Sequence, residues 1–210
     1  MKNYVITIAR GYGSGGRQIG MQLAGELGIQ FIDKELLKLA SIESGINEAL
    51  FSLADERIKK NLFKQSKKNS VGFLLTPEDE AFLSDENLFN YQARILRLLS
   101  LSESYVVMGR AADYILKDNK NVVSVNIQAP FEDCVKSIMM RAGVEEKQAI
   151  KAIRTTDKCR ADYYKFYTGN DWNDVTNYDM TLNSKKVGRE KCVEVIKSYT
   201  KLKLGIEIEG

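Results

Sequence analysis

Short apolar runs alternate with longer amphipathic stretches along the chain, and this alternation predicts strands separated by helices. Val, Ile and Tyr dominate the longer runs, as is typical of strands buried on both faces of a parallel sheet. Strands that alternate with helices indicate a doubly wound α/β sheet. The predicted strands are Tyr4–Ile8, Gln30–Ile32, Tyr105–Met108, Val122–Ile127 and Tyr178–Leu182.

Residue types at the ends of the amphipathic stretches predict three helices. Ser is a favoured N-cap, and Pro is tolerated in the first turn because its missing N–H is not needed there. The predicted helices run from Ser84 to about Leu101, from Pro130 to Arg141 and from Gly188 to about Thr200.

Two long segments, about 34–104 and about 143–177, are mostly helical and polar and lack a convincing strand. We therefore expect residues 1–210 to form a single domain whose sheet carries one insertion after the second strand and another after the fourth. The first insertion contains KKNLFKQSKKNS, which indicates a mobile basic loop with a solvated face. The tail KLKLGIEIE alternates with period two and favours an edge strand or an association arm.

Composition excludes several classes of protein. A net charge of +3 gives no bulk attraction to nucleic acid or a membrane surface, so neither is expected as a partner. No apolar run approaches the roughly 20 residues that a membrane span needs, and the first strand is too short for a signal peptide. The three cysteines are far apart and are interpreted as reduced thiols of a cytoplasmic protein.

The chain contains no histidine. This excludes Ser–His–Asp and Cys–His catalysis and removes the commonest zinc ligand. Carboxylates, cations, backbone amides and a borrowed metal ion remain, and phosphoryl transfer is the reaction class that uses them.

A glycine-rich turn, GYGSGG, joins the first strand to a helical stretch and fits two nucleotide-binding templates. Gly11, Gly13 and Gly16 spell G-x-G-x-x-G, and Asp33 follows the next strand, as in a dinucleotide-binding fingerprint. The same glycines also flank a P-loop in which Arg17 stands in the place of the lysine and Gln18 in the place of the hydroxyl. A plain strand-to-helix turn is the third interpretation.

Cations elsewhere in the chain favour the P-loop. Arg110 follows the third long strand, at the sheet edge where ligands bind in this class of fold. Arg154, Lys158 and Arg160 form a further cationic group with Asp157 in the second insertion. These are more positive groups than a dinucleotide needs, and they suit two phosphate-bearing substrates.

Three segments carry a family resemblance: ITIARGYGSGGRQIGMQLAGELGIQFIDKELL, VVMGRAADYIL and RTTDKCRADYYKFYTGNDWNDVTNYDMTLNS. They resemble the cytidylate kinase-like family, which is related to the P-loop nucleoside monophosphate kinases, and the resemblance covers essentially the whole chain. It implies an α/β three-layer P-loop NTPase fold with a mainly parallel five-stranded sheet, a helical acceptor-binding insertion and a lid. It also implies ATP-dependent phosphoryl transfer with Mg²⁺ to a small phosphorylated acceptor, most of all a pyrimidine nucleoside monophosphate.

The resemblance implies a role for the residues of the glycine turn and the second strand end. Arg17 would take the lysine's role, and Asp33 would hold Mg²⁺ through water or orient the acceptor. A helix N-cap is the competing interpretation of Asp33. The residues implied to bind the ATP phosphates are Gly11, Gly13, Ser14, Gly15, Gly16, Arg17 and Gln18.

On the acceptor side, Arg110 would bind the acceptor phosphate by the same resemblance. The aspartate that follows this arginine in cytidylate kinases is Ala111 here, and Asp113 is expected to face another side of the helix. Gln92 and Arg94 are further acceptor-pocket candidates, whereas Arg97 is assigned to a solvated polar face.

In the lid, Arg154 and Arg160 resemble the arginines that close over the triphosphate, and with Arg17 and Asp33 they complete the implied catalytic set. An intrahelical pair between Arg154 and Asp157 is the alternative. The aromatic stretch YYKFYTGNDWND favours core packing over a stacking platform for a base. The implied lid residues are Arg141, Arg154, Asp157, Lys158 and Arg160.

Two other functions remain open. Arg17, Gln18 and Ala111 favour a nucleotide-binding protein that has lost efficient catalysis and acts as a ligand-controlled switch. An NAD(P)-binding oxidoreductase is the third hypothesis and ranks last. The sequence does not determine the oligomeric state.

Overall fold

The computed structural model describes residues 3–58 and 74–207. In this part of the chain, strands form a single five-stranded sheet in the order β2-β3-β1-β4-β5, and every neighbouring pair is parallel. The predicted α/β class and the five parallel strands are therefore confirmed. The strands are β1 Val5–Arg10, β2 Gln30–Ile32, β3 Tyr105–Met108, β4 Val122–Gln128 and β5 Met180–Asn183.

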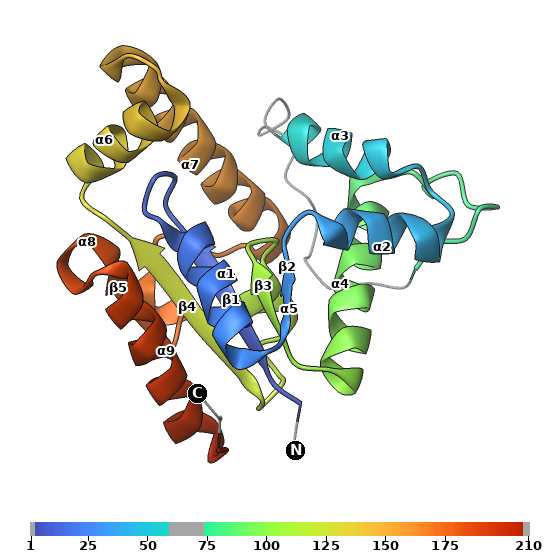
Figure 1. Cartoon of the computed structure of the whole chain (residues 1–210). Helices are drawn as coiled ribbons and strands as arrows, with labels where there is room; N and C mark the ends of the chain where they lie inside the picture. The colour runs from blue at the N-terminus through green and yellow to red at the C-terminus, as the bar shows by residue number, and fades with distance from the viewer. Residues whose placement is uncertain (1–2, 59–73, 208–210) are drawn as a thin grey trace.

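Helices cover both faces of the sheet and give three layers (Figure 1). Helices α1 and α9 pack on one face through Leu23 and Ile196, against the apolar side chains of β1, β3 and β4. Helices α2, α4 and α5 pack on the other, with the end of α7. The helices are α1 Gly16–Leu27, α2 Glu35–Ser44, α3 Glu48–Ile58, α4 Asp85–Ser102, α5 Ala112–Ile115, α6 Phe131–Ala142, α7 Glu146–Thr168, the 3₁₀ turn η1 Val175–Asn177, α8 Ser184–Val187 and α9 Arg189–Leu204.

The register of the sheet brings the ends of three strands to one edge. Ile8 of β1 lies opposite Met108 of β3, and Ile32 of β2 lies opposite Val107. The residues that follow these positions, among them Arg10 and Asp33, therefore leave the sheet on the same side. Ligands bind at this carboxyl edge in open parallel sheets.

Helices α6 and α7 form a hairpin beyond that edge (Figure 1). A capping box at Glu145 starts α7, and the hairpin has a small apolar cluster of its own that includes Ile138 and Ile153. Because α7 is 23 residues long, its second half reaches back to the sheet, where Tyr164 and Tyr167 join the main core.

The helix-end signals are confirmed closely. Ser84 caps α4 and accepts a hydrogen bond from the N–H of Asn87, and α6 begins directly after Pro130. The basic stretch KKNLFKQSKKNS lies outside the described residues. Among the described helices, none is both long enough and apolar enough to cross a bilayer.

The edge strand, one of the two alternatives predicted for the tail, is wrong for residues 201–207, and residues 208 and 209 lie outside the described part of the chain. The association arm stays a prediction. Residues 201–204 continue helix α9, which ends at Gly205 in the left-handed conformation. Ile196, Thr200 and Leu204 follow one another at spacing four and pack on the same side of the helix. The helical period of this buried stripe overrides the short period-two pattern of KLKLGIEIE.

Leu23→Ala is expected to lower the free energy of unfolding by about 3 kcal/mol, because it leaves a cavity between α1 and the sheet. Leu23 is fully buried, whereas Leu202 is 82% exposed on α9. Leu202→Ala, the same chemical change, should therefore leave stability within about 0.5 kcal/mol of the wild type. Urea unfolding followed by circular dichroism checks both variants. Equal losses would contradict the assignment of this core.

Candidate active site

The loop between β1 and α1 requires glycine at two positions. Gly13 and Gly15 have φ angles of 92° and 78°, in the region that L side chains rarely adopt. A Cβ at Gly13 would also lie 2.8 Å from the carbonyl oxygen of Cys134 at the start of α6. The backbone of the loop therefore packs closely under the hairpin.

This loop presents backbone N–H groups at the N-terminus of α1. Within the described part of the chain, the N–H groups of Gly13 and Gly15 donate to no protein acceptor. The Ser14 hydroxyl turns inward, donating to the carbonyl of Gly11 at 2.9 Å. Free amides at the positive end of a helix dipole form an anion-binding site.

Two other elements hold the loop in place. The Ser184 hydroxyl, at the start of α8, donates to the carbonyl of Ser14 at 2.6 Å. On the other side, Asp157 of α7 accepts the backbone N–H of Tyr12 at 2.8 Å, and the Arg160 guanidinium donates to the carbonyl of Arg10 at 2.8 Å. Arg160 and Asp157 also pair with each other at 3.0 Å. The loop is therefore fixed against α7 by its backbone.

Arg17 projects from the first turn of α1 toward the end of β2. Its Nε lies 2.9 Å from the Asp33 carboxylate, and its guanidinium lies 5.8 Å from the centre of the Phe31 ring. Asp33 does not cap α2, because Lys34 occupies the N-cap position there. The N-cap interpretation of Asp33 is therefore wrong, and the ion pair with Arg17 is its main interaction.

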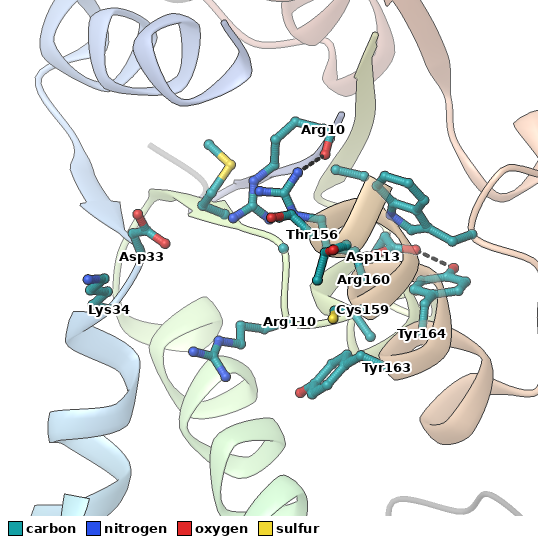
Figure 2. A pocket seen from close by; sticks show the side chains of 16 residues that line it. Arg10, Asp33, Lys34, Arg110, Asp113, Thr156, Cys159, Arg160, Tyr163 and Tyr164 are labelled. Atoms are coloured by element: carbon teal, nitrogen blue, oxygen red, sulfur yellow. Dashed lines mark hydrogen bonds between the residues drawn. The ribbon is translucent and has the colours of Figure 1, made fainter. Parts of the chain in front are cut away.

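A cavity of about 370 Å³ lies at the strand ends (Figure 2), and Arg10, the residue directly before the glycine loop, is part of its lining. The ends of β1, β2 and β3 form one wall, and one face of α7 forms the opposite wall. Arg10, Lys34, Arg110 and Arg160 bring four cationic groups to its lining. Asp33 and Asp113 bring two carboxyl groups, so positive charge is in excess among the lining side chains.

The turn after β3 has an unusual backbone. Gly109, Arg110 and Ala111 have φ angles of 69°, 61° and 51°, so three consecutive residues are left-handed. This conformation costs free energy for the two residues that carry a Cβ, and such strain clusters at ligand sites. The hydrogen bond from the N–H of Gly109 to the carbonyl of Ile8, 2.9 Å, joins the turn to β1. It places Arg110 and Ala111 in the cavity wall.

Asp113 also lines the cavity, so the expectation that it faces elsewhere is wrong. The left-handed turn before α5 rotates this short helix so that Asp113 points inward. The hydroxyl of Tyr164 donates to Asp113 Oδ2 at 2.6 Å (Figure 2). Burial raises the pKa of the Asp113 carboxyl to about 6, and the hydrogen bond from Tyr164 opposes this rise.

Arg10 is the lining residue that sequence reasoning missed most clearly. It ends β1, and burial, followed by the positive charge of Arg160, lowers the pKa of its guanidinium to about 9. A charge at the end of the apolar run VITIA, directly before the glycines, is the signal that could have identified it. Four further residues that line the cavity and were not predicted lie on α7, on the same face of the helix as Arg160. They are Thr156, Cys159, Tyr163 and Tyr164.

The structure separates the remaining acceptor candidates from this cavity. Arg94 is exposed and lies 3.4 Å from Glu43, and Gln92 is buried within α4 with its amide near the carbonyl of Leu88. Neither residue lines the cavity. Trp172, in the aromatic stretch, is 7% exposed and belongs both to the core and to the cavity wall.

The lid candidates have different neighbours. Arg154 is exposed beside the Phe131 ring, at 5.8 Å, and Asp157 pairs with Arg160 instead. Lys158 forms an ion pair with Asp162 at 2.7 Å. The Arg141 guanidinium lies 5.3 Å from the centre of the Tyr12 ring, over the glycine loop. Arg160 and Asp157 therefore meet the loop directly, whereas Arg154 and Lys158 do not.

Protein ligands for a metal ion are few at this edge of the sheet. The described residues contain no cluster of three or more His, Cys, Asp or Glu side chains that could hold one. Mg²⁺ is commonly bound by one carboxylate together with phosphate oxygens and water. Asp33, at the end of β2, is a carboxylate beside the glycine loop that fits this pattern.

Comparison with known proteins gives a family match. The model of the cytidylate kinase-like family matches residues 5–186. A search of curated proteins finds no match.

Among solved structures, an uncharacterized protein from Eubacterium ventriosum ATCC 27560 is similar over 95% of this chain and 99% of its own, with 26% identity and a TM-score of 0.69. A shikimate kinase from Bacteroides thetaiotaomicron matches at 14% identity and a TM-score of 0.48, covering 94% of this chain and 98% of its own. A sugar kinase from Janibacter sp. HTCC2649 matches at 14% identity and a TM-score of 0.49, covering 94% of each chain.

Asp113→Asn is expected to stabilise the protein at pH 7 by about 1 to 2 kcal/mol, because it removes a carboxylate that is costly to ionise in the cavity. The raised pKa means that the folded protein keeps a proton that the unfolded chain releases between 3.8 and about 6. The wild type therefore loses stability at this group as pH rises through that range, and the gain of the variant shrinks toward pH 4. Urea unfolding at both pH values checks this. The exposed Asp118→Asn is the control, and a gain independent of pH would contradict the assignment.

Proposed function

Because the chain belongs to the cytidylate kinase-like family, we propose that it transfers the γ-phosphoryl group of ATP to a small phosphorylated acceptor. The leading acceptor is a pyrimidine nucleoside monophosphate. One observation carries the proposal: the amides of Gly13 and Gly15 donate to no acceptor among the described residues, and the residue that precedes their loop, Arg10, lines a cavity together with two further arginines. A transfer between two phosphorylated substrates requires two phosphate-binding sites close to each other.

On the donor side, the amides of Gly13 and Gly15 and the first turn of α1 would bind the β-phosphate of ATP. Arg17 would supply the positive charge near the β- and γ-phosphates. Its Nε is already bonded to Asp33, so its orientation is set before ATP binds. A planar guanidinium cannot occupy the same place as an ammonium, but it offers two parallel N–H groups to phosphate oxygens.

On the acceptor side, Arg110 would bind the phosphate of the acceptor. An oxygen of that phosphate would attack the γ-phosphorus and form a new P–O bond. The bond between the γ-phosphorus and the β,γ-bridging oxygen would break, and ADP would leave. Charge in this transition state is spread over the equatorial oxygens, so positioned cations stabilise it more than a general base would.

Arg160 is suited to act between the two substrates. It holds the carbonyl of Arg10 at 2.8 Å, next to the glycine loop, and it also lines the cavity. Asp157 fixes its guanidinium from the other side. Arg160 would therefore stabilise the transferring group without a large movement of its side chain.

Mg²⁺ would accompany ATP, with Asp33 as its nearest carboxylate, acting through water. Bound there, the ion would neutralise charge on the β- and γ-phosphates. Because Asp33 also pairs with Arg17, its position would couple the proposed metal site to the donor cation.

Two departures from the family pattern, Gln18 and Ala111, favour a second function, that of a nucleotide-binding switch. Gln18 offers no hydroxyl for a metal ion, and Ala111 offers no carboxylate to an acceptor base. A protein of this kind could bind nucleotide without efficient transfer and use the Asp157–Tyr12 contact as a switch between α7 and the loop. The dinucleotide hypothesis loses support, because β1 lies between β3 and β4 and β2 lies one strand further away. In the dinucleotide-binding fold, β2 is the direct neighbour of β1.

Incubation with ATP–Mg²⁺ and a panel of nucleoside monophosphates is expected to yield ADP with at least one pyrimidine monophosphate, at a rate that depends on the acceptor. The Gly13→Ala variant should lose this activity, since its Cβ would meet the Cys134 carbonyl and distort the loop. Coupled ADP detection measures turnover. Thermal stabilisation by ATP without acceptor-dependent ADP would favour the switch instead.

Arg160→Met is expected to lower kcat by about 100-fold, because it removes a cation positioned for the transition state. Lys151→Met removes an exposed charge from the same helix and should leave kcat unchanged. Steady-state kinetics with the best acceptor of the panel checks both. A normal kcat with a raised KM would assign Arg160 to ground-state binding only.

A further inference from the structure

The guanidinium of Arg10 lies in the cavity, and no carboxylate in the described part of the chain pairs with it. Among the described residues, no acidic side chain comes within ion-pair distance of it. The three nearby carboxyl groups have other partners: Asp33 is bonded to Arg17, Asp157 to Arg160 and Asp113 to Tyr164. A partly buried cation of this kind is costly for the folded protein.

Two glycines make room for this side chain. A Cβ at Gly16 would lie 2.6 Å from Arg10 Cβ, and a Cβ at Gly109 would collide with Arg10 Nη1. Gly16 belongs to the start of α1 and Gly109 to the turn after β3. Both neighbouring elements are therefore shaped around Arg10, and they aim its guanidinium at the cavity.

The surroundings of Arg10 repel further positive charge. Arg160 and Arg110 both act against its ionisation, and Asp33 and Asp157 compensate only in part. Figure 2 shows the three arginines around the same cavity, with Arg10 and Arg160 close together. They come from β1, from the turn after β3 and from α7, so they approach from different directions. Such an arrangement is stabilised when an anion binds among the three groups.

We propose that Arg10, with Arg110 and Arg160, binds a dianionic phosphate group of the acceptor. This deepens the proposed function, on which it rests for treating the cavity as the acceptor site. Each guanidinium can donate two N–H groups, and a phosphate dianion has enough oxygen lone pairs to accept from all three. A carboxylate carries one charge and two oxygens, so it would accept hydrogen bonds from fewer of the N–H groups that the three guanidiniums offer. The pocket should therefore select phosphorylated acceptors over carboxylic acids.

If the Arg10 side chain had only a structural role, Arg10→Met would have a different melting temperature from the one that the proposal predicts. The link from this residue to α7 uses its carbonyl oxygen, which any residue retains. Arg10→Met should therefore fold and, without an anion, melt at or above the temperature of the wild type, because it removes a partly buried charge that Asp33 and Asp157 compensate only in part. If Arg10 is structural, the variant should melt clearly lower in the same buffer.

The test measures thermal unfolding in chloride buffer with increasing inorganic phosphate, and in parallel with acetate. Wild-type protein should gain stability with phosphate and not with acetate. Arg10→Met should lose most of the gain, with phosphate affinity reduced by at least about tenfold. Arg10→Lys keeps the charge but not the planar fork, and it should fall between the two. Arg97→Met removes an exposed arginine outside the cavity and should behave as the wild type does.

The glycine loop is the competing phosphate site, and Gly13→Ala separates the two. If the cavity binds the anion, Gly13→Ala should keep most of the phosphate-dependent gain. Loss of the gain in Gly13→Ala, or its retention in Arg10→Met, would overturn the proposal. The experiment contains no ATP, so it can succeed when phosphoryl transfer fails. Conversely, turnover with an acceptor KM unchanged by Arg10→Met would leave the proposed function standing and the role of Arg10 refuted.

Discussion

The attachment of α7 to the backbone of the glycine loop is the constraint on which the site depends. Asp157 accepts the N–H of Tyr12, and Arg160 donates to the carbonyl of Arg10, both at 2.8 Å. These two bonds fix the loop without using the amides of Gly13 and Gly15. They also bring one face of α7 over the strand ends, which closes the cavity beside the loop. The proposed donor and acceptor surfaces would therefore be parts of one arrangement, joined by these two hydrogen bonds.

Charge is distributed unevenly across this arrangement. Arg17 and Arg160 each have a carboxylate partner, so their positions are set at little electrostatic cost. Arg10 has none among the described residues, and burial together with the positive charge of Arg160 lowers its pKa to about 9. The anion proposed to bind among the three arginines would offset this cost in stability. The paired cations would orient phosphates, and the unpaired one would contribute most to their affinity.

Much of the fold could be predicted from the sequence, because the strands are short apolar runs and the helix ends carry clear signals such as Ser84 and Pro130. Asp113 was misplaced because its direction depends on three left-handed residues, two of which, Arg110 and Ala111, are not glycine. In the tail, the period-two pattern is shorter than the helical stripe of Ile196 and Thr200 that precedes it, and the stripe determines the structure through residue 204. Arg10 was missed because its surroundings come from elements that are distant in sequence. Contacts between elements that are distant in sequence follow from the tertiary fold and not from local spacing.

The central claim is that the loop amides bind a triphosphate beside an acceptor phosphate in the cavity. A crystal structure with a non-hydrolysable ATP analogue, Mg²⁺ and CMP tests it most directly. The account predicts the β-phosphate within hydrogen-bond distance of the N–H groups of Gly13 and Gly15, and the CMP phosphate among Arg10, Arg110 and Arg160. Nucleotide phosphates bound away from the glycine loop, or a CMP phosphate that meets none of these three arginines, would contradict it.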